Sequence, residues 1–144
     1  MKTRLVLVTV TVLGCLSGCA KPDWIQQTLV TADVTGVWTG TTLAGMTTSM
    51  EVRLDLEQRG PKVVGDFRVI GGAGAGFLGL VGGTATAIDG TVAGDVFTFK
   101  QRSGALAGDF TVSGDEMVGS ISSGTALRLS LRRVSATPRP ASRP

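Results

Sequence analysis

The stretch MEVRLDLE (residues 50–57) alternates apolar and charged side chains without interruption. Successive side chains of a β-strand point to opposite faces, so this spacing predicts a strand with one dry face and one wet face. The stretch LRLSLR (residues 127–132) repeats the pattern near the end of the chain. No segment between these two has the helical period, and the sequence therefore predicts an all-β domain.

Strand-like segments alternate with turn signals from residue 34 to residue 134. Most of the turns carry glycine beside Asp, Ser or Pro, which favour tight reversals, and Asp89-Gly90 is a strong hairpin signal. The predicted strands are 34–42, 46–58, 63–70, 78–88, 91–100, 105–112, 117–121 and 125–134. Eight strands joined by short turns predict an antiparallel up-and-down meander. Closing this meander into a small barrel removes both exposed sheet edges.

The apolar faces of these strands supply a core for one domain, which is what 144 residues allow. A barrel of eight strands is just wide enough to be filled by side chains or to hold one small ligand. Since the domain has no disulfide, we expect most of its apolar side chains to pack inside. The expected core is Trp38, Val52, Leu54, Leu56, Phe67, Val69, Phe97, Phe99, Phe110, Val112, Met117, Ile121, Leu127, Leu129 and Leu131.

The first eighteen residues differ in kind from the rest of the chain. A basic start (MKTR, residues 1–4) precedes a short apolar run (LVLVTVTVLGCL, residues 5–16), which fits a signal-peptide core better than a membrane span. The sequence LSGC (residues 16–19) then resembles the lipobox of bacterial lipoproteins. The resemblance implies cleavage between Gly18 and Cys19, with a diacylglycerol on the sulfur and an acyl chain on the new amino group of Cys19.

This resemblance also implies a cellular location for the mature protein. Two or more acyl chains hold a protein on a membrane, whereas one chain is marginal. In proteobacterial lipoproteins an Asp after the cysteine favours retention at the inner membrane; here that residue is Ala20. We therefore expect an outer-membrane lipoprotein facing the periplasm, with residues 1–18 as signal peptide and residues 19–33 as lipidated tether. The barrel domain follows over residues 34–134, and residues 135–144 (SATPRPASRP) form a Pro- and Arg-rich disordered tail.

Composition argues against several classes of function. The chain has no histidine and no tyrosine, and its other cysteine leaves with the signal peptide, so we expect no catalytic residue, no metal site and no cofactor. The formal charge of +3 includes Lys2 and Arg4, and the mature chain with twelve basic and eleven acidic residues is near +1. This charge gives no basis for a nucleic-acid partner.

The motif Gly36-Val37-Trp38 at the start of the first predicted strand resembles the G-x-W of lipocalins and avidins, the calycin group of β-barrels. In that group the tryptophan closes one barrel end, and a basic residue of the last strand packs over it. Here the basic residue is Arg128, Arg132 or Arg133, and we favour Arg132. The resemblance extends to the fold and not to a ligand, because the biotin site of avidins requires tyrosine.

A glycine-rich stretch at residues 71–83 contains the pattern G-x-G-x-x-G at residues 74–79. The dinucleotide interpretation requires a helix directly after it, and the following residues (LVGGT, 80–84) do not favour one. A flexible hairpin loop is the simpler interpretation. The alternative is a lid or contact loop with Phe77 and Leu78 exposed, in which case replacing both by Ser leaves folding unchanged.

These observations predict a membrane-tethered, non-enzymatic β-barrel that acts by binding. The first version is an envelope protein-interaction module, and the alternative is a lipocalin-like carrier of a small apolar ligand. An enzyme is the third interpretation. The state of the barrel interior separates the first two, because a hollow favours the carrier and a filled core favours binding on the outer face or the loops.

Overall fold

The computed structural model describes residues 32–44, 48–71, 76 and 78–137. The expected signal peptide, most of the tether, Phe77 and residues 138–144 of the tail lie outside the described residues. No helix among the described residues is long and apolar enough to cross a membrane. The strands are β1 (Gly36–Ala44), β2 (Thr48–Arg59), β3 (Lys62–Gly71), β4 (Thr86–Ala93), β5 (Val96–Gln101), β6 (Ala107–Ser113), β7 (Glu116–Ser122) and β8 (Ala126–Ser135).

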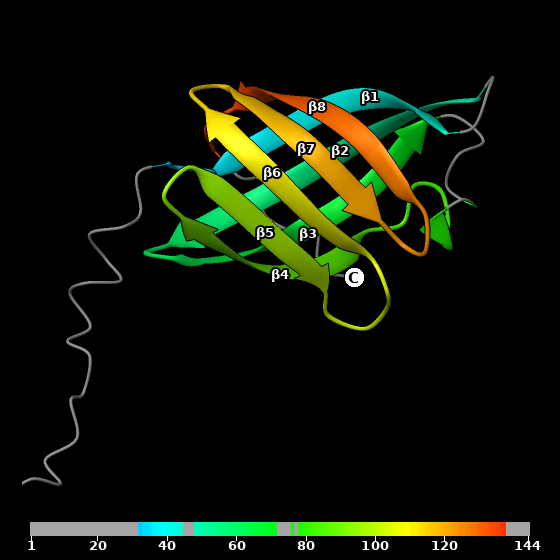
Figure 1. The fold of residues 1–144 in the computed structure, drawn as a ribbon, viewed down its shortest axis with the longest axis horizontal. Coiled ribbons are helices and arrows are strands. Elements are labelled where there is room, and N and C mark those ends of the chain that lie inside the picture. Colours follow the sequence, from blue (N-terminus) through cyan, green and yellow to red (C-terminus); the bar gives the residue numbers. More distant parts are fainter. Residues whose placement is uncertain (1–31, 45–47, 72–75, 77, 138–144) are drawn as a thin grey trace, which may run out of the picture.

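The eight strands form an antiparallel meander in which each strand pairs with the next in sequence. β1 also pairs with β8, and this pairing closes the sheet into a barrel. In Figure 1, β5 to β8 lie in front of β1 to β4, and the two groups of strands cross. The predicted fold class is therefore confirmed, and a closed eight-stranded barrel is consistent with a calycin-like fold.

The boundary between the fourth and fifth strands differs from the prediction. Asp89 and Gly90 lie inside β4, and the chain reverses at Gly94-Asp95 instead. Gly94 has a φ of 64°, a left-handed conformation that glycine adopts at no steric cost and that a tight turn requires. The hairpin signal at residues 89–90 is thus overridden by a second glycine four residues later.

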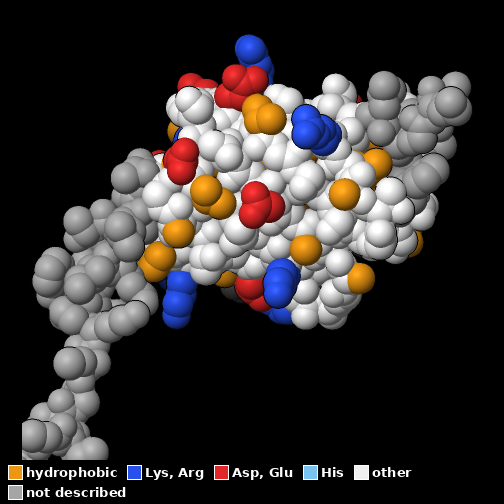
Figure 2. All heavy atoms as spheres, viewed as in Figure 1, with side chains coloured by type: hydrophobic (Ala, Val, Ile, Leu, Met, Phe, Trp, Pro, Cys, Tyr) orange, Lys and Arg blue, Asp and Glu red, His pale blue; other side chains and the backbone are white. Residues whose placement is uncertain are grey.

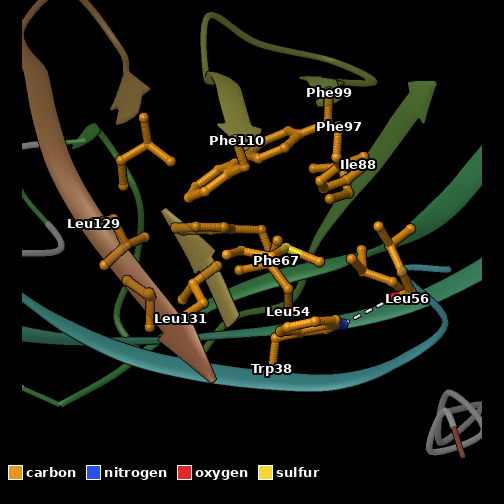
Figure 3. Packing of buried hydrophobic residues seen from close by; sticks show 14 of the residues in the cluster. Trp38, Leu54, Leu56, Phe67, Ile88, Phe97, Phe99, Phe110, Leu129 and Leu131 are labelled. Carbon is orange, nitrogen blue, oxygen red and sulfur yellow. Dashed lines mark hydrogen bonds between the residues drawn. The ribbon is translucent and has the colours of Figure 1, made fainter. Parts of the chain in front are cut away.

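The inward-facing side chains fill the barrel (Figure 3). Every residue of the predicted core is buried, and Trp38 and Phe110 are 0% exposed. The rings of Phe67, Phe97, Phe99 and Phe110 lie next to one another, with centroids 5.8–6.5 Å apart. The alternation of apolar and polar residues along the strands thus identified the core, because one face of each strand points into the barrel. The core also includes Val34, Met50, Val63, Leu78, Ile88, Val92 and Leu106, which the prediction did not name.

The two ends of the barrel are built differently. One end holds the start of β1 and the turns at Gly60-Pro61, Gly94-Asp95 and Gly114-Asp115. We call it the Trp38 end. There each turn accepts a backbone hydrogen bond from a neighbouring strand, as Asp115 O does from Arg133 N at 2.9 Å. The opposite end carries the loops that follow β3, β5 and β7. The hydrogen bonds accepted by the turns therefore join neighbouring hairpins around the rim of the Trp38 end.

Candidate functional site

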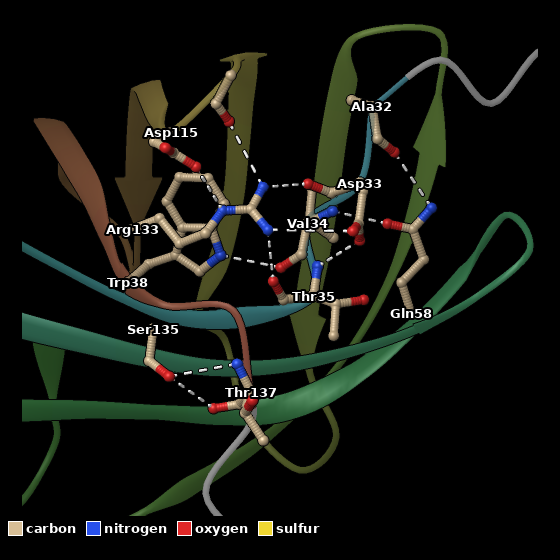
Figure 4. Close-up of polar contacts among 11 residues, drawn as sticks. Ala32, Asp33, Val34, Thr35, Trp38, Gln58, Asp115, Arg133, Ser135 and Thr137 are labelled. Atoms are coloured by element: carbon tan, nitrogen blue, oxygen red, sulfur yellow. Dashed lines mark hydrogen bonds and ion pairs between the residues drawn. The ribbon is translucent and has the colours of Figure 1, made fainter.

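The Trp38 end is closed by an aromatic ring and a guanidinium group (Figure 4). The indole N–H of Trp38 donates to Val34 O at 2.9 Å, which satisfies its polar atom inside the barrel. The Arg133 guanidinium carbon lies 4.5 Å from the ring centroid of Trp38, a cation–π contact. The chain before β1 and the end of β8 thus meet over one tryptophan.

The Arg133 side chain is only 14% exposed, so its charge needs partners. Its two terminal nitrogens donate to Thr35 O at 2.7 Å and to Asp33 O at 2.6 Å. Its Nε lies 3.0 Å from a carboxylate oxygen of Asp115, a close ion pair without the geometry of a directed hydrogen bond. Arg133 therefore links β8, the turn before β7 and the segment before β1.

The structure places Arg133, and not the favoured Arg132, over Trp38. Leu129 and Leu131 point inward, so the next inward position along β8 is residue 133, whereas Arg132 is exposed and lies opposite Thr39. Arg133 lies directly opposite Trp38 in the β1–β8 pairing, and a β-bulge follows it between Trp38 and Val37. If the alternation of LRLSLR (residues 127–132) is extended by one residue, it predicts that residue 133 faces inward.

Gln58 at the end of β2 fixes the segment that enters the barrel. Its side-chain amide donates to Ala32 O at 3.2 Å, and its carbonyl accepts from Val34 N at 2.8 Å. On the other side, Ala32 N donates to Gly94 O at 3.1 Å. Residues 32–35 are therefore held by three parts of the barrel. This role of Gln58 could not be predicted from the sequence, because its contacts are to backbone atoms far away in the chain.

At the opposite end of the barrel, the hypothesis that Leu78 is exposed in a contact loop is wrong. Leu78 is 2% exposed and belongs to the core, and Leu80 packs partly against the core. The backbone of this loop is bound to the barrel, since Gly83 N donates to Val69 O at 2.8 Å. Among the described residues of the loop, Val81 is an exposed large apolar side chain, at 72%. Leu78 is thus buried because it covers the open end of the barrel, while Phe77 is not described.

A hollow of about 570 Å³ lies on the outer face of β4 to β7. Four of the side chains that line it form a cross-strand row, Thr91, Thr98, Asp109 and Ser120. The surrounding side chains include Asp89, Lys100, Ala107 and Ser122. In Figure 2 the side of the molecule formed by β5 to β8 is largely uncharged, with single hydrophobic and charged side chains spread over it. Small and hydroxyl-bearing residues therefore dominate this surface.

The charged groups around the hollow are unevenly paired. The carboxylate of Asp89 accepts two hydrogen bonds from Arg102, with a closest approach of 2.6 Å, and these bonds lower the pKa of Asp89. Lys100 lies directly across from Asp89 in the β4–β5 ladder. Asp109 takes part in none of the ion pairs among the described residues. Lys100 takes part in none of these ion pairs either, so one carboxylate and one ammonium group of the hollow are without an ion pair in the described part of the chain.

The face formed by β2 and β3 has a different character, because charged residues alternate along both strands. There Arg53 forms a two-pronged pair with Asp55, at 2.8 Å for the closest atoms, and this hydrogen bonding raises the pKa of Arg53. Asp55 is 8% exposed, so the pair is largely withdrawn from water. The Arg53–Asp55 pair is thus satisfied within the fold, whereas Glu51, Asp66 and Arg68 of the same face take part in none of the ion pairs among the described residues.

Comparison of the chain with protein-family models, curated protein sequences and solved structures finds no match. The described residues contain no group of three or more His, Cys, Asp or Glu side chains placed to hold a metal ion. The fold and its surface chemistry are thus the basis for considering function.

Proposed function

We propose that this chain is a lipid-anchored protein of the bacterial envelope whose barrel binds a protein partner through its outer surface. The proposal joins two independent features. The lipobox-like sequence before Cys19 supports the anchor, and the packing of the barrel supports binding on the outside.

The filled interior of the barrel is the observation that supports binding on the outside. Large side chains occupy the barrel axis, and even the inward-facing glycines leave little room: a Cβ added at Gly90 would lie 2.8 Å from the Phe97 ring, and one at Gly108 would overlap the Phe99 ring. Trp38 covers one end and Leu78 the other. A small apolar ligand would therefore have to displace core side chains, which costs more than binding in a preformed hollow.

The anchor would join the barrel at a fixed point. If Cys19 carries lipid, residues 20–31 connect it to Ala32, where Gln58 and Gly94 hold the chain. Twelve extended residues span at most about 40 Å, so the Trp38 end would stay within that distance of the membrane. The outer face of β4 to β7 would remain open to a partner in the periplasm.

Native mass spectrometry tests binding on the outside against the carrier alternative. The chain from Ala20 onward, exported to a periplasm and purified gently, is expected to show its sequence mass alone. Extra mass that disappears on denaturation would overturn the proposal in favour of the carrier.

The anchor needs a separate test in cells. Full-length chain labelled with radioactive palmitate should carry label in the membrane fraction, and a Cys19→Ser variant should carry none. Label that persists in the variant, or is absent from the wild type, would contradict the anchor.

A further inference from the structure

We propose that residues 138–144 (PRPASRP) lie over the outer face of β1 to β3 and pair with the charges left unpaired there, Asp66 and Arg68. The occupant of this face is thus a segment of the same chain, which lies outside the described residues and which the sequence alone predicts to be disordered. The inference goes beyond the proposed function, because it concerns a face other than the one left open to a partner.

The outer face of β1 and β2 is withdrawn from water close to the end of β8. Val37 and Asp55 lie opposite each other at outward positions, yet they are only 4% and 8% exposed. Val118, at an outward position of β7, is 54% exposed. The Arg53 side chain accounts for part of the cover over Asp55, through their ion pair. An apolar side chain such as Val37 is stabilised on the outside of a barrel when more chain covers it.

The charged groups of this face are only half paired. In the β2–β3 ladder Asp55 lies opposite Asp66, and in the next outward row Arg53 lies opposite Arg68, so like charges face each other twice. Arg53 and Asp55 bind each other, whereas Asp66 and Arg68 take part in no ion pair in the part of the chain that the structure describes. The Nε of Arg68 is moreover buried without a hydrogen-bond partner there, which is costly for a guanidinium. An occupant of this face should therefore bring an acceptor for Arg68 and a cation for Asp66.

The last described residues of the chain lie beside this face. Ser135 pairs with Val37, and its hydroxyl binds both polar backbone atoms of Thr137 in a bend directly after β8. Two strand spacings, about 10 Å, separate Val37 from the row position of Asp66. Seven residues in the polyproline conformation span about 22 Å. Residues 138–144 are therefore long enough to cross β1, β2 and β3.

The segment PRPASRP supplies both groups that the face lacks. Its three prolines favour the extended polyproline conformation, in which the backbone carbonyls bind no other part of the segment. One of these carbonyls can accept the hydrogen bond that the Nε of Arg68 lacks. Arg139 or Arg143 can pair with Asp66, which would offset the repulsion between Asp66 and Asp55. A stiff segment of this kind also loses little conformational entropy when it docks.

A spin label tests this placement. The chain from Ala20 onward contains no cysteine, so Ser142→Cys provides a single thiol for a nitroxide. In a ¹⁵N-labelled sample the nitroxide should broaden the backbone amide signals of Asp66 and Arg68 more than that of Asp115, which lies on the other side of β8. The reduced form of the label gives the reference spectrum. Broadening centred on Asp115, or equal on both sides of β8, would show an undocked segment and overturn the proposal.

Matched variants of the labelled chain assign the contact to the unpaired charges. Asp66→Asn should reduce the broadening of the Arg68 signal at least about twofold, because a partly exposed ion pair shifts an equilibrium by up to about fivefold. Asp109→Asn, a carboxylate on β6, should leave it unchanged. If Asp66→Asn is broadened like the parent chain, the inference fails. Broadening that disappears on dilution would assign the face to the segment of a second copy and would equally overturn it.

Discussion

At the scale of single residues, Arg133 joins three parts of the chain at the Trp38 end and contacts the Trp38 ring. Replacing it by Met would leave Thr35 O and Asp33 O without their donors and remove the cation from Trp38. We expect Arg133→Met to lower the free energy of unfolding by about 2–4 kcal/mol. Arg132→Met removes an exposed neighbour and should change it by less than about 0.5 kcal/mol. Urea unfolding followed by circular dichroism measures both, and equal losses would contradict the closure by Arg133.

A second residue-scale prediction concerns the pKa of Asp89. Arg102 lowers it by hydrogen bonding, so Arg102→Gln should return it toward the ordinary value. Because the pKa is lowered in the folded state, this pair stabilises the fold above the ordinary pKa of the carboxyl group. That stabilisation is lost as the pH falls through the folded value. A ¹³C titration of the carboxyl signal measures the shift, and Arg132→Gln serves as the control. An unchanged pKa in Arg102→Gln would refute the assignment.

Residues on the inner face were predictable from sequence, and those that bind backbone atoms were not. The period of two placed Trp38 and Leu131 inside, and it also reaches Arg133. Gln58 is different, because its partners are atoms of Ala32 and Val34 whose path no local pattern specifies. Asp109 was not singled out from the sequence. Its position in a hollow depends on how neighbouring strands align, which the sequence of one strand does not contain.

At the scale of elements, the close approach of β6 to the aromatic core gives a test of packing. Gly108→Ala would place a methyl group against the Phe99 ring, and we expect a loss of about 1–3 kcal/mol in unfolding free energy. Gly76→Ala makes the same change where a Cβ has open space and should be neutral. Denaturant unfolding compares the two. A neutral Gly108→Ala would mean that β6 can move away from the rings, and the hollow above would then not be rigid.

The loop after β3 provides a second test at this scale. Leu78→Ser removes a buried side chain and buries a hydroxyl, so we expect a loss of about 3–5 kcal/mol. Val81→Ser changes an exposed apolar residue of the same loop and should alter stability by less than about 0.5 kcal/mol. Thermal unfolding of the two single variants measures the difference. A stable Leu78→Ser variant would restore the sequence-based hypothesis of an exposed contact loop.

The predicted number and order of strands are confirmed, because hydrophobic alternation and glycine-containing turns repeat along the chain. The errors lie where glycine is abundant. Gly90 and Gly94 both offer a turn, and only the packing of Gly90 against Phe97 decides that β4 continues through it. Likewise, residues 78–85 were predicted as part of a strand, although β4 begins at Thr86. Local glycine signals thus leave open which of several turns the barrel uses.

At the scale of the whole molecule, closure depends on one pairing between distant parts of the chain. Residues 37–41 of β1 pair with residues 130–135 of β8, and every other pairing joins neighbours in sequence. The described chain also enters and leaves at the same end, since Val37 lies opposite Ser135. Which strand comes first should therefore matter little to the barrel, provided that all eight are present.

A circular permutant tests this conclusion. It joins Thr137 to Ala32 by a short glycine-rich linker and opens the exposed turn between Gly124 and Thr125, so that β8 becomes the first strand. We expect it to fold, with the native near-ultraviolet circular dichroism and one cooperative unfolding transition, because the β1–β8 pairing becomes a local hairpin.

The matched comparison is a chain that ends at Gly124 and lacks β8. It would expose the edges of β1 and β7 and lose the Arg133 contacts, and we expect it to aggregate or to unfold without cooperativity. If the shortened chain folds like the wild type, β8 does not close the barrel. A permutant that fails to fold would show instead that the order of the strands matters, and that the meander needs β1 and β2 in place before β8 can complete the sheet.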